Sequence, residues 1–163
     1  MSNKQLILGI DPGLVKTGWG VIVKYGTDVG YVNCGVILTK VSDLMEARLC
    51  HIFDEISALL DDYKPSAVAM EEVFVNSNYK SSEKLIMART AAFLAVAKHG
   101  ISISQYRPNE IKKNITGLGH ASKEQIYTFV RKILKTDFCP DNKTHTYDSF
   151  DALAIALSRA FCS

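Results

Sequence analysis

Leu6-Ile7-Leu8-Gly9-Ile10 carries no polar side chain, and the run ends at Asp11. A run that is apolar at every position, rather than at alternate positions, predicts a strand over residues 5–10 that is buried on both faces of a sheet. Pro12-Gly13 then turns the chain. The next two stretches, 17–24 and 31–39, are rich in β-branched and aromatic residues, which favour strands. The opening of the chain therefore predicts a three-stranded antiparallel meander.

A second apolar run, Ala67-Val68-Ala69-Met70, ends in a carboxylate in the same way, at Glu71. Residues 42–62 lie between the two runs and repeat their apolar side chains at helical spacing until Pro65 stops the pattern. A helix that connects two buried strands is a crossover, so the second strand should lie parallel to the first. The carboxyl ends of both strands, with Asp11 and Glu71, then meet at one edge of the sheet.

Four further helices and one strand complete the pattern, at 82–99, 108–116, 122–135, 147–161 and, for the strand, 101–106. The order of elements predicts an α/β fold. It consists of a mixed five-stranded sheet, made of the antiparallel meander plus parallel strands, with helices on both faces. A chain of 163 residues is long enough for one complete core and too short for two, so residues 1–163 are expected to form a single domain.

The composition is typical of a globular protein without long low-complexity segments, with 47% hydrophobic and 22% charged residues. A net charge of +2 permits a nucleic-acid partner without requiring one. The N-terminal apolar run is too short for a signal peptide or a membrane span, so we expect a cytoplasmic protein with no membrane contact. The four cysteines are far apart in the sequence, which argues against a zinc site or a disulfide framework.

The predicted helix 82–99 is apolar nearly all round, because residues 85–88 and 91–97 leave little polar face. A helix of this kind must bury two sides. One side can cover the sheet, and we predict that the other contacts a second copy of the chain across a two-fold axis. The C-terminal helix of the same chain is the alternative cover, and the sequence leaves both open.

A third group of carboxylates, Asp148 and Asp151, opens the C-terminal helix and projects from one of its faces. These two could simply cap that helix and interact with its dipole, and Asp11 could cap a turn. Glu71 has no such explanation, because it ends a strand. Carboxylates at the ends of buried elements are costly unless they are paired or bind a cation.

Taken together, the carboxylates of Asp11, Glu71, Asp148 and Asp151 predict a site for hard divalent cations. Oxygen ligands without a histidine or cysteine set suit Mg²⁺, with Mn²⁺ as a plausible substitute. Two such ions about 4 Å apart could activate a water molecule and stabilise the leaving oxygen of a phosphodiester. We therefore expect two Mg²⁺ ions per subunit and a reaction on phosphate.

Four stretches of the chain resemble the RuvC family of Holliday-junction resolvases, which are crossover junction endodeoxyribonucleases of the ribonuclease-H-like superfamily. They are Ile7-Leu8-Gly9-Ile10-Asp11-Pro12-Gly13 with Thr17-Gly18-Trp19-Gly20, Ala69-Met70-Glu71-Glu72-Val73-Phe74, Gly117-Leu118-Gly119-His120-Ala121-Ser122-Lys123, and Asp148-Ser149-Phe150-Asp151-Ala152-Leu153-Ala154-Ile155-Ala156. Any one stretch is a weak signal, but the four together are specific. The resemblance implies a ribonuclease-H-like fold and an endonuclease that resolves four-way DNA junctions in recombination and DNA repair.

The resemblance also implies roles for individual residues. The catalytic carboxylates that bind the metals would be Asp11, Glu71, Asp148 and Asp151. Lys112 and Lys123 would be basic catalytic residues that hold phosphates near the metals, and Phe74 would contact an unpaired base of the junction. The family works as a symmetric homodimer that cuts two strands of like polarity. Whether a branch-migration motor complex delivers the junction is left open.

Three segments depart from the pattern that the family usually has. The loop 136–147 is longer and places His145 close to the predicted site, where it could be a base, a ligand or, as we prefer, part of the loop surface. Residues 85–90 replace a stretch that the family builds with glycines, which leaves the dimer packing open. Residues 76–82 also differ, so the sequence predicts no cleavage preference.

Rival functions share parts of the same pattern. Asp11-Pro12-Gly13 with Thr17-Gly18 also resembles the first phosphate loop of actin-like ATPases and sugar kinases. Those proteins need two such domains to close on ATP, and this chain has room for one. A non-catalytic nucleic-acid binding module of the same fold is a second alternative, although the complete set of four carboxylates argues against it. A related small nuclease that acts on RNA is a third.

Overall fold

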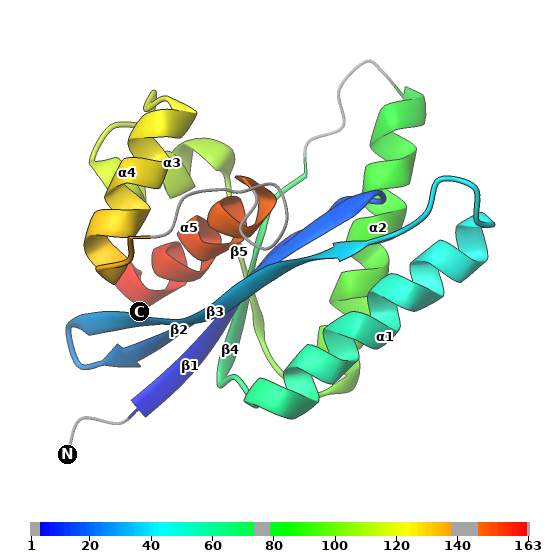
Figure 1. The fold of residues 1–163 in the computed structure, drawn as a ribbon, viewed down its shortest axis with the longest axis horizontal. Helices are drawn as coiled ribbons and strands as arrows, with labels where there is room; N and C mark the ends of the chain where they lie inside the picture. The colour runs from blue at the N-terminus through cyan, green and yellow to red at the C-terminus, as the bar shows by residue number, and fades with distance from the viewer. Residues whose placement is uncertain (1–3, 74–78, 138–146, 163) are drawn as a thin grey trace.

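A five-stranded sheet lies at the centre of the computed structural model, with helices on both of its faces (Figure 1). The structure describes residues 4–73, 79–137 and 147–162. The strands, which lie in the spatial order β3-β2-β1-β4-β5, are β1 (Lys4–Asp11), β2 (Lys16–Tyr25), β3 (Asp28–Leu38), β4 (Ala67–Glu71) and β5 (Ile103–Tyr106). The helices are α1 (Met45–Tyr63), α2 (Tyr79–Lys98), α3 (Pro108–Thr116), α4 (Lys123–Leu134) and α5 (Tyr147–Phe161).

The pairing of the strands confirms the predicted mixed sheet. β1, β2 and β3 form an antiparallel meander, whereas β4 pairs in parallel with both β1 and β5. Ile10 lies beside Met70 in the register of β1 and β4. The next residue of each strand is acidic, so Asp11 and Glu71 leave the sheet at the same edge.

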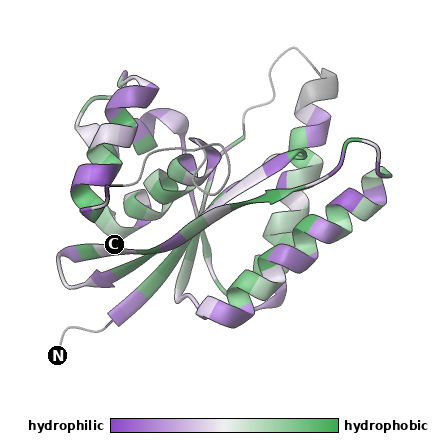
Figure 2. Cartoon of the chain, viewed as in Figure 1, coloured by the Kyte–Doolittle hydropathy of each residue, from purple (hydrophilic) through white to green (hydrophobic). Residues whose placement is uncertain are grey.

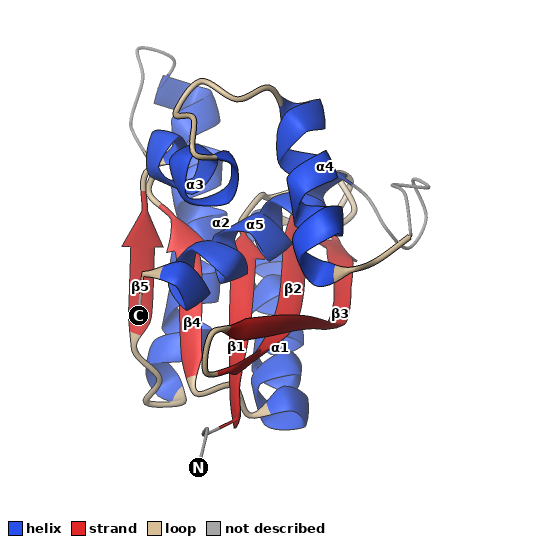
Figure 3. Cartoon of the chain, turned by 90° about the vertical axis from the view of Figure 1, so that its left-hand side faces the viewer, coloured by secondary structure: helices blue, strands red, loops and turns tan. Residues whose placement is uncertain are grey.

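Different helices cover the two faces of the sheet. α1 and α2 lie on one face, and α3, α4 and α5 lie on the other, with α5 directly against the strands (Figures 1 and 3). β1 is buried between them as predicted, because Leu8 and Ile10 pack with α1 and α2 while Ile7 packs with α5. α5 is hydrophobic over most of its length, whereas α1 and α4 alternate between hydrophilic and hydrophobic residues (Figure 2). In the described ranges, no helix is long and apolar enough to span a bilayer.

Four elements begin two or more residues from their predicted start. α1 begins at Met45 rather than at residue 42, and Leu44 at its N-cap makes no side-chain cap. β3 begins at Asp28 rather than at residue 31, because the chain reverses tightly at Gly26, whose φ of 57° suits a glycine. α2 begins three residues earlier and β5 two residues later than predicted. These shifts move no element to another face and leave the order of elements as predicted.

A partly exposed apolar surface lies between α1 and α2. The alternative in which α5 covers α2 is wrong, because α5 packs on the opposite face of the sheet (Figure 3). α1 packs beside α2 instead, and the two helices line a cavity of about 450 Å³ whose apolar residues include Leu49, Phe53, Ile86 and Leu94. Leu94 is 55% exposed. We call this surface the α1–α2 groove.

Candidate active site

Glycines in β1 and β2 allow α5 to pack unusually close to the sheet. A Cβ atom on Gly9 would lie 2.0 Å from the backbone oxygen of Ala152, and one on Gly18 would lie 2.0 Å from the backbone oxygen of Asp148. A Cβ on Gly20 would lie 2.7 Å from the Cδ2 atom of Leu153. No other residue type leaves room for this approach. The glycines therefore determine how near the first turns of α5 come to the end of β1.

One cavity at the carboxyl edge of the sheet collects most of the predicted site residues. Its volume is about 330 Å³, and we call it the acidic cavity. The charged residues that line it come from five different elements: Asp11 at the end of β1, Glu71 at the end of β4, Lys112 on α3, Lys123 at the start of α4 and Asp151 on α5. Ile111, Ile126, Ala154 and Ile155 supply apolar walls.

Asp11 is the most perturbed of these carboxylates. Burial, followed by repulsion from Asp151, Glu71 and Asp148, raises the pKa of Asp11 from 3.8 to about 8, and the charge of Lys123 opposes this shift only in part. Asp148 is absent from the lining of the acidic cavity but acts on Asp11 and Asp151 through its charge. The structure thus brings all four predicted carboxylates into electrostatic contact.

Burial also raises the pKa of Glu71 and of Asp151, and the charge of Lys123 opposes both shifts. For Glu71, Asp151 raises the pKa further, while Lys123 and Lys112 lower it. For Asp151, Lys123 lowers the pKa and Asp148 raises it. The Nζ atom of Lys123 lies 3.7 Å from Oδ2 of Asp151, and the Lys123 side chain is 70% exposed. Lys123 can therefore exchange this carboxylate for another anion that enters from solvent.

Tyr127 is a residue of the site that the sequence did not single out. Its hydroxyl donates to Oδ1 of Asp151 at 3.4 Å, although its ring is buried against Tyr147 and Phe150. Burial raises the pKa of the Tyr127 hydroxyl, followed by the charge of Asp151, so the group stays a proton donor. The only sequence signal was its helical spacing from Lys123, which many core tyrosines share.

The donor chemistry of the acidic cavity fits a hard divalent cation. Three carboxylates with raised pKa values repel one another across one cavity, and a cation of charge +2 would offset that repulsion. As they stand, no three His, Cys, Asp or Glu side chains within the described part of the chain are grouped closely enough to enclose a metal ion. Binding would therefore require the carboxylates to draw together, with Lys123 leaving Asp151.

Phe74 and His145 lie outside the described residues.

Comparison with known proteins identifies the family. Residues 7–159 match the family model for crossover junction endodeoxyribonuclease RuvC. The chain belongs to the RuvC family. Among its relatives, the RuvC of Orientia tsutsugamushi (strain Ikeda) is 44% identical over 154 residues, which cover 94% of each chain. That of Methylobacterium radiotolerans is 41% identical over 160 residues, which cover 98% of this chain and 75% of the relative.

Solved structures of Holliday junction resolvases have the same fold. The structure of T. thermophilus RuvC in complex with a Holliday junction substrate has a TM-score of 0.88 and 31% identity, covering 97% of this chain and 94% of that one. The yeast mitochondrial Holliday junction resolvase has a TM-score of 0.69 over 95% of this chain and 77% of its own, but at 14% identity it supports the fold alone. The predicted ribonuclease-H-like fold and the RuvC resemblance are thus confirmed, and the rival ATPase and non-catalytic functions are not favoured.

Proposed function

We propose that this chain resolves four-way DNA junctions by hydrolysing phosphodiesters, as a structure-selective endonuclease in recombination and repair. The observation that carries the proposal is the acidic cavity, where carboxylates from three distant elements face two lysines in a member of the RuvC family. Its T. thermophilus relative binds a Holliday junction substrate. We assign the activity to one nuclease domain, residues 1–163, acting in the cytoplasm.

The family implies a metal-dependent nuclease, and we assign the metal site to Asp11, Glu71, Asp148 and Asp151. We expect two Mg²⁺ ions per subunit, with Mn²⁺ as a substitute, because the ligands are carboxylate oxygens. When bound, such ions activate water and offset the negative charge that develops on the phosphate. The chain's own contribution is to hold four carboxylates together despite their repulsion, and Tyr127 fixes one of them by its hydrogen bond to Asp151.

The two lysines are suited to bind the phosphate that is cut. Lys112 and Lys123 enter the acidic cavity from the side of α3 and α4, opposite the strand ends that carry Asp11 and Glu71. A cation held beside the phosphate stabilises the charge that develops in the transition state. Ile111 and Ile126 keep part of this wall apolar and limit its access to water. Phe74 remains a predicted stacking partner for an unpaired base of the junction.

The α1–α2 groove is the surface that we assign to the homodimer. Its apolar lining is partly exposed, and it lies on the opposite face of the sheet from α5 and the lysines of the acidic cavity. A second copy that packed there would bury the groove and leave both acidic cavities open to one junction. Two symmetric cuts then follow from two-fold symmetry. We also propose a branch-migration motor complex as a partner.

A cleavage assay on a synthetic four-way junction with Mg²⁺ tests the proposal. The control substrate is a linear duplex of the same sequence, and the control protein carries Asp11→Asn. We expect the parent protein to make paired cuts in opposing arms of the junction and to leave 5′-phosphate ends. It should not cleave the duplex, and Asp11→Asn should not cleave the junction. Cleavage of both substrates at the same rate would overturn the junction selectivity. ATP hydrolysis without junction binding would favour the rival ATPase function.

A further inference from the structure

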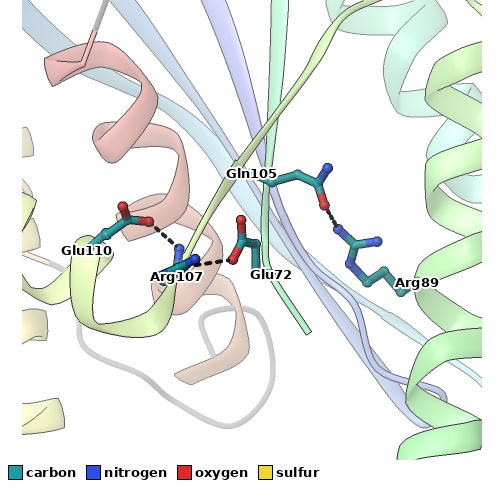
Figure 4. Close-up of polar contacts among 5 residues, drawn as sticks. All are labelled: Glu72, Arg89, Gln105, Arg107 and Glu110. Carbon is teal, nitrogen blue, oxygen red and sulfur yellow. Dashed lines mark hydrogen bonds and ion pairs between the residues drawn. The ribbon is translucent and has the colours of Figure 1, made fainter. Parts of the chain in front are cut away.

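Two arginines approach the end of β4 from different sides (Figure 4). β4 ends at Glu71, whose carboxylate lines the acidic cavity, and Glu72 follows it. Arg89 extends to this point from α2. Arg107, which directly precedes α3, extends to it from the other side. The two arginines contact different groups, so their roles can be separated.

Arg89 ties three elements together through one guanidinium. Its Nε atom donates to the backbone oxygen of Glu71 at 3.3 Å, and its Nη2 atom donates to Oε1 of Gln105 on β5. The guanidinium also lies 5.7 Å from the ring centroid of Phe93, one turn further along α2. A planar group with donors in a fixed fork can hold two acceptors in one geometry, which a lysine cannot do.

The end of β4 is a place where such a contact matters. Glu71 is the last residue of the strand, and the next ladder bond, from the amide of Glu72 to the oxygen of Tyr106, is 2.8 Å long. The Glu71 carboxylate lines the acidic cavity together with those of Asp11 and Asp151, so its position decides whether the three carboxylates can share a ligand. The backbone of Glu71 must therefore be held in place if its carboxylate is to keep that position.

We propose that Arg89 is a positioning residue for Glu71. It holds the backbone of the last residue of β4 against α2 and β5, and so fixes where the carboxylate enters the acidic cavity. The inference rests on the proposed function, because the effect on turnover exists only if Glu71 takes part in cleavage. Arg89 itself contributes no group to the lining of that cavity.

Arg107 supplies a matched control at the same strand end. Its Nε atom lies 3.3 Å from Oε2 of Glu72, and the two side chains are 65% and 35% exposed. An exposed ion pair of this kind contributes little to stability. Its backbone amide, which donates to Glu110 at 2.7 Å, is retained in Arg107→Ala. Arg107→Ala therefore removes a charge near Glu71 without touching the Glu71 backbone.

Kinetics on the four-way junction test the role of Arg89. We expect Arg89→Ala to lower kcat by about 10- to 100-fold, since small displacements of a reacting group have effects of this size. The junction Kd and its salt dependence should stay within about twofold of the parent. Arg89→Lys should rescue kcat only in part, and Arg107→Ala should change it less than about twofold. A weaker, less salt-dependent junction affinity that Arg89→Lys restores would make Arg89 a phosphate contact and overturn the proposal.

Hydrogen exchange gives a second measurement that needs no catalysis. Amides of residues 67–73 should exchange faster in Arg89→Ala than in the parent, and at the parent rate in Arg107→Ala. Gln105→Ala removes the exposed side-chain acceptor of Arg89 and should increase the exchange rate of these amides by a smaller amount. This variant replaces Arg89→Ala as the test if Arg89→Ala does not fold. Unchanged exchange in these variants would overturn the inference. If the parent protein fails to cut junctions, the proposed function fails, and the exchange rates still decide whether Arg89 holds β4.

Discussion

The two faces of the sheet are covered in opposite ways. On one face α5 lies against Gly9, Gly18 and Gly20 so closely that a single Cβ would collide with it, and this contact carries charged groups to the strand ends. On the other face α1 and α2 leave an apolar groove in which Leu94 is 55% exposed. The first face is complete within one chain, and the second is suited to a partner. In the proposed function, catalysis and dimer assembly therefore use separate faces of the sheet.

The largest effect should come from Asp11→Asn, which removes one carboxylate of the acidic cavity. We expect cleavage to fall below detection, because the variant weakens the metal site, while junction affinity stays nearly intact. Gel assays of cutting and of binding measure the two properties. The variant should also keep the oligomeric state of the parent, since the α1–α2 groove lies on the other face. Full cleavage by this variant would end the assignment of the site.

Gly9→Ala should have the next largest effect, on folding. The added Cβ would lie 2.0 Å from the backbone oxygen of Ala152, so α5 must move away from β1. We expect a loss of about 3 kcal/mol or more in the free energy of unfolding. Urea denaturation measures this, with Gly119→Ala as the control, because the nearest atom to a Cβ there is 3.8 Å away. Equal stability of the two variants would show that the close packing of α5 is not required.

Leu94→Glu should separate assembly from folding. A charge in the α1–α2 groove opposes burial of that surface, so we expect sedimentation at micromolar concentration to change from dimer to monomer. The free energy of unfolding of one subunit should change little, because Leu94 is already exposed. Leu118→Glu, at a leucine that is 62% exposed outside the groove, is the control. A parent protein that sediments as a monomer would remove the groove from the proposal.

The pH dependence of stability tests the acidic cavity without DNA. Because the folded pKa of Asp11 is raised to about 8 from 3.8, the folded state binds this proton more tightly than the unfolded state. Stability without metal should therefore fall as pH rises from about 4 to about 8. In EDTA, Asp11→Asn should exceed the parent by at least about 1 kcal/mol at pH 9, with a smaller gap at pH 5. Urea titrations that showed the parent gaining stability over this range would contradict the assignment.

Lys123→Ala should give the smallest effect. Loss of one phosphate contact should reduce the slope of log affinity against log salt by about one, together with a lower turnover. Lys98→Ala, on the α1–α2 face, is the control and should leave both unchanged. If Lys123→Ala behaves like Lys98→Ala, then Lys123 is only a solvated surface lysine.

Local pattern was enough to predict the elements on which the site depends. Burial and helical periodicity can be recognised from residues that are close together in the sequence. This made it possible to predict the apolar strands that end at Asp11 and Glu71 and the helix that opens with Asp148 and Asp151. The start of α1 was not, because a serine at residue 42 was available as a cap and the helix begins after Leu44 instead. The preference for a capping residue has less effect on where a helix begins than the packing of that helix against the rest of the protein.

The amino-acid sequence by itself determined the order of the elements, the edge where the carboxylates emerge and the family of the chain. Only the tertiary structure decided which face of the sheet α5 covers, that Tyr127 reaches Asp151, and that Arg89 donates a hydrogen bond to the backbone oxygen of Glu71. The physical reason is range. Periodicity reports the burial of a residue among its neighbours, whereas the two hydrogen bonds join residues that are 18 and 24 positions apart and depend on how whole helices pack.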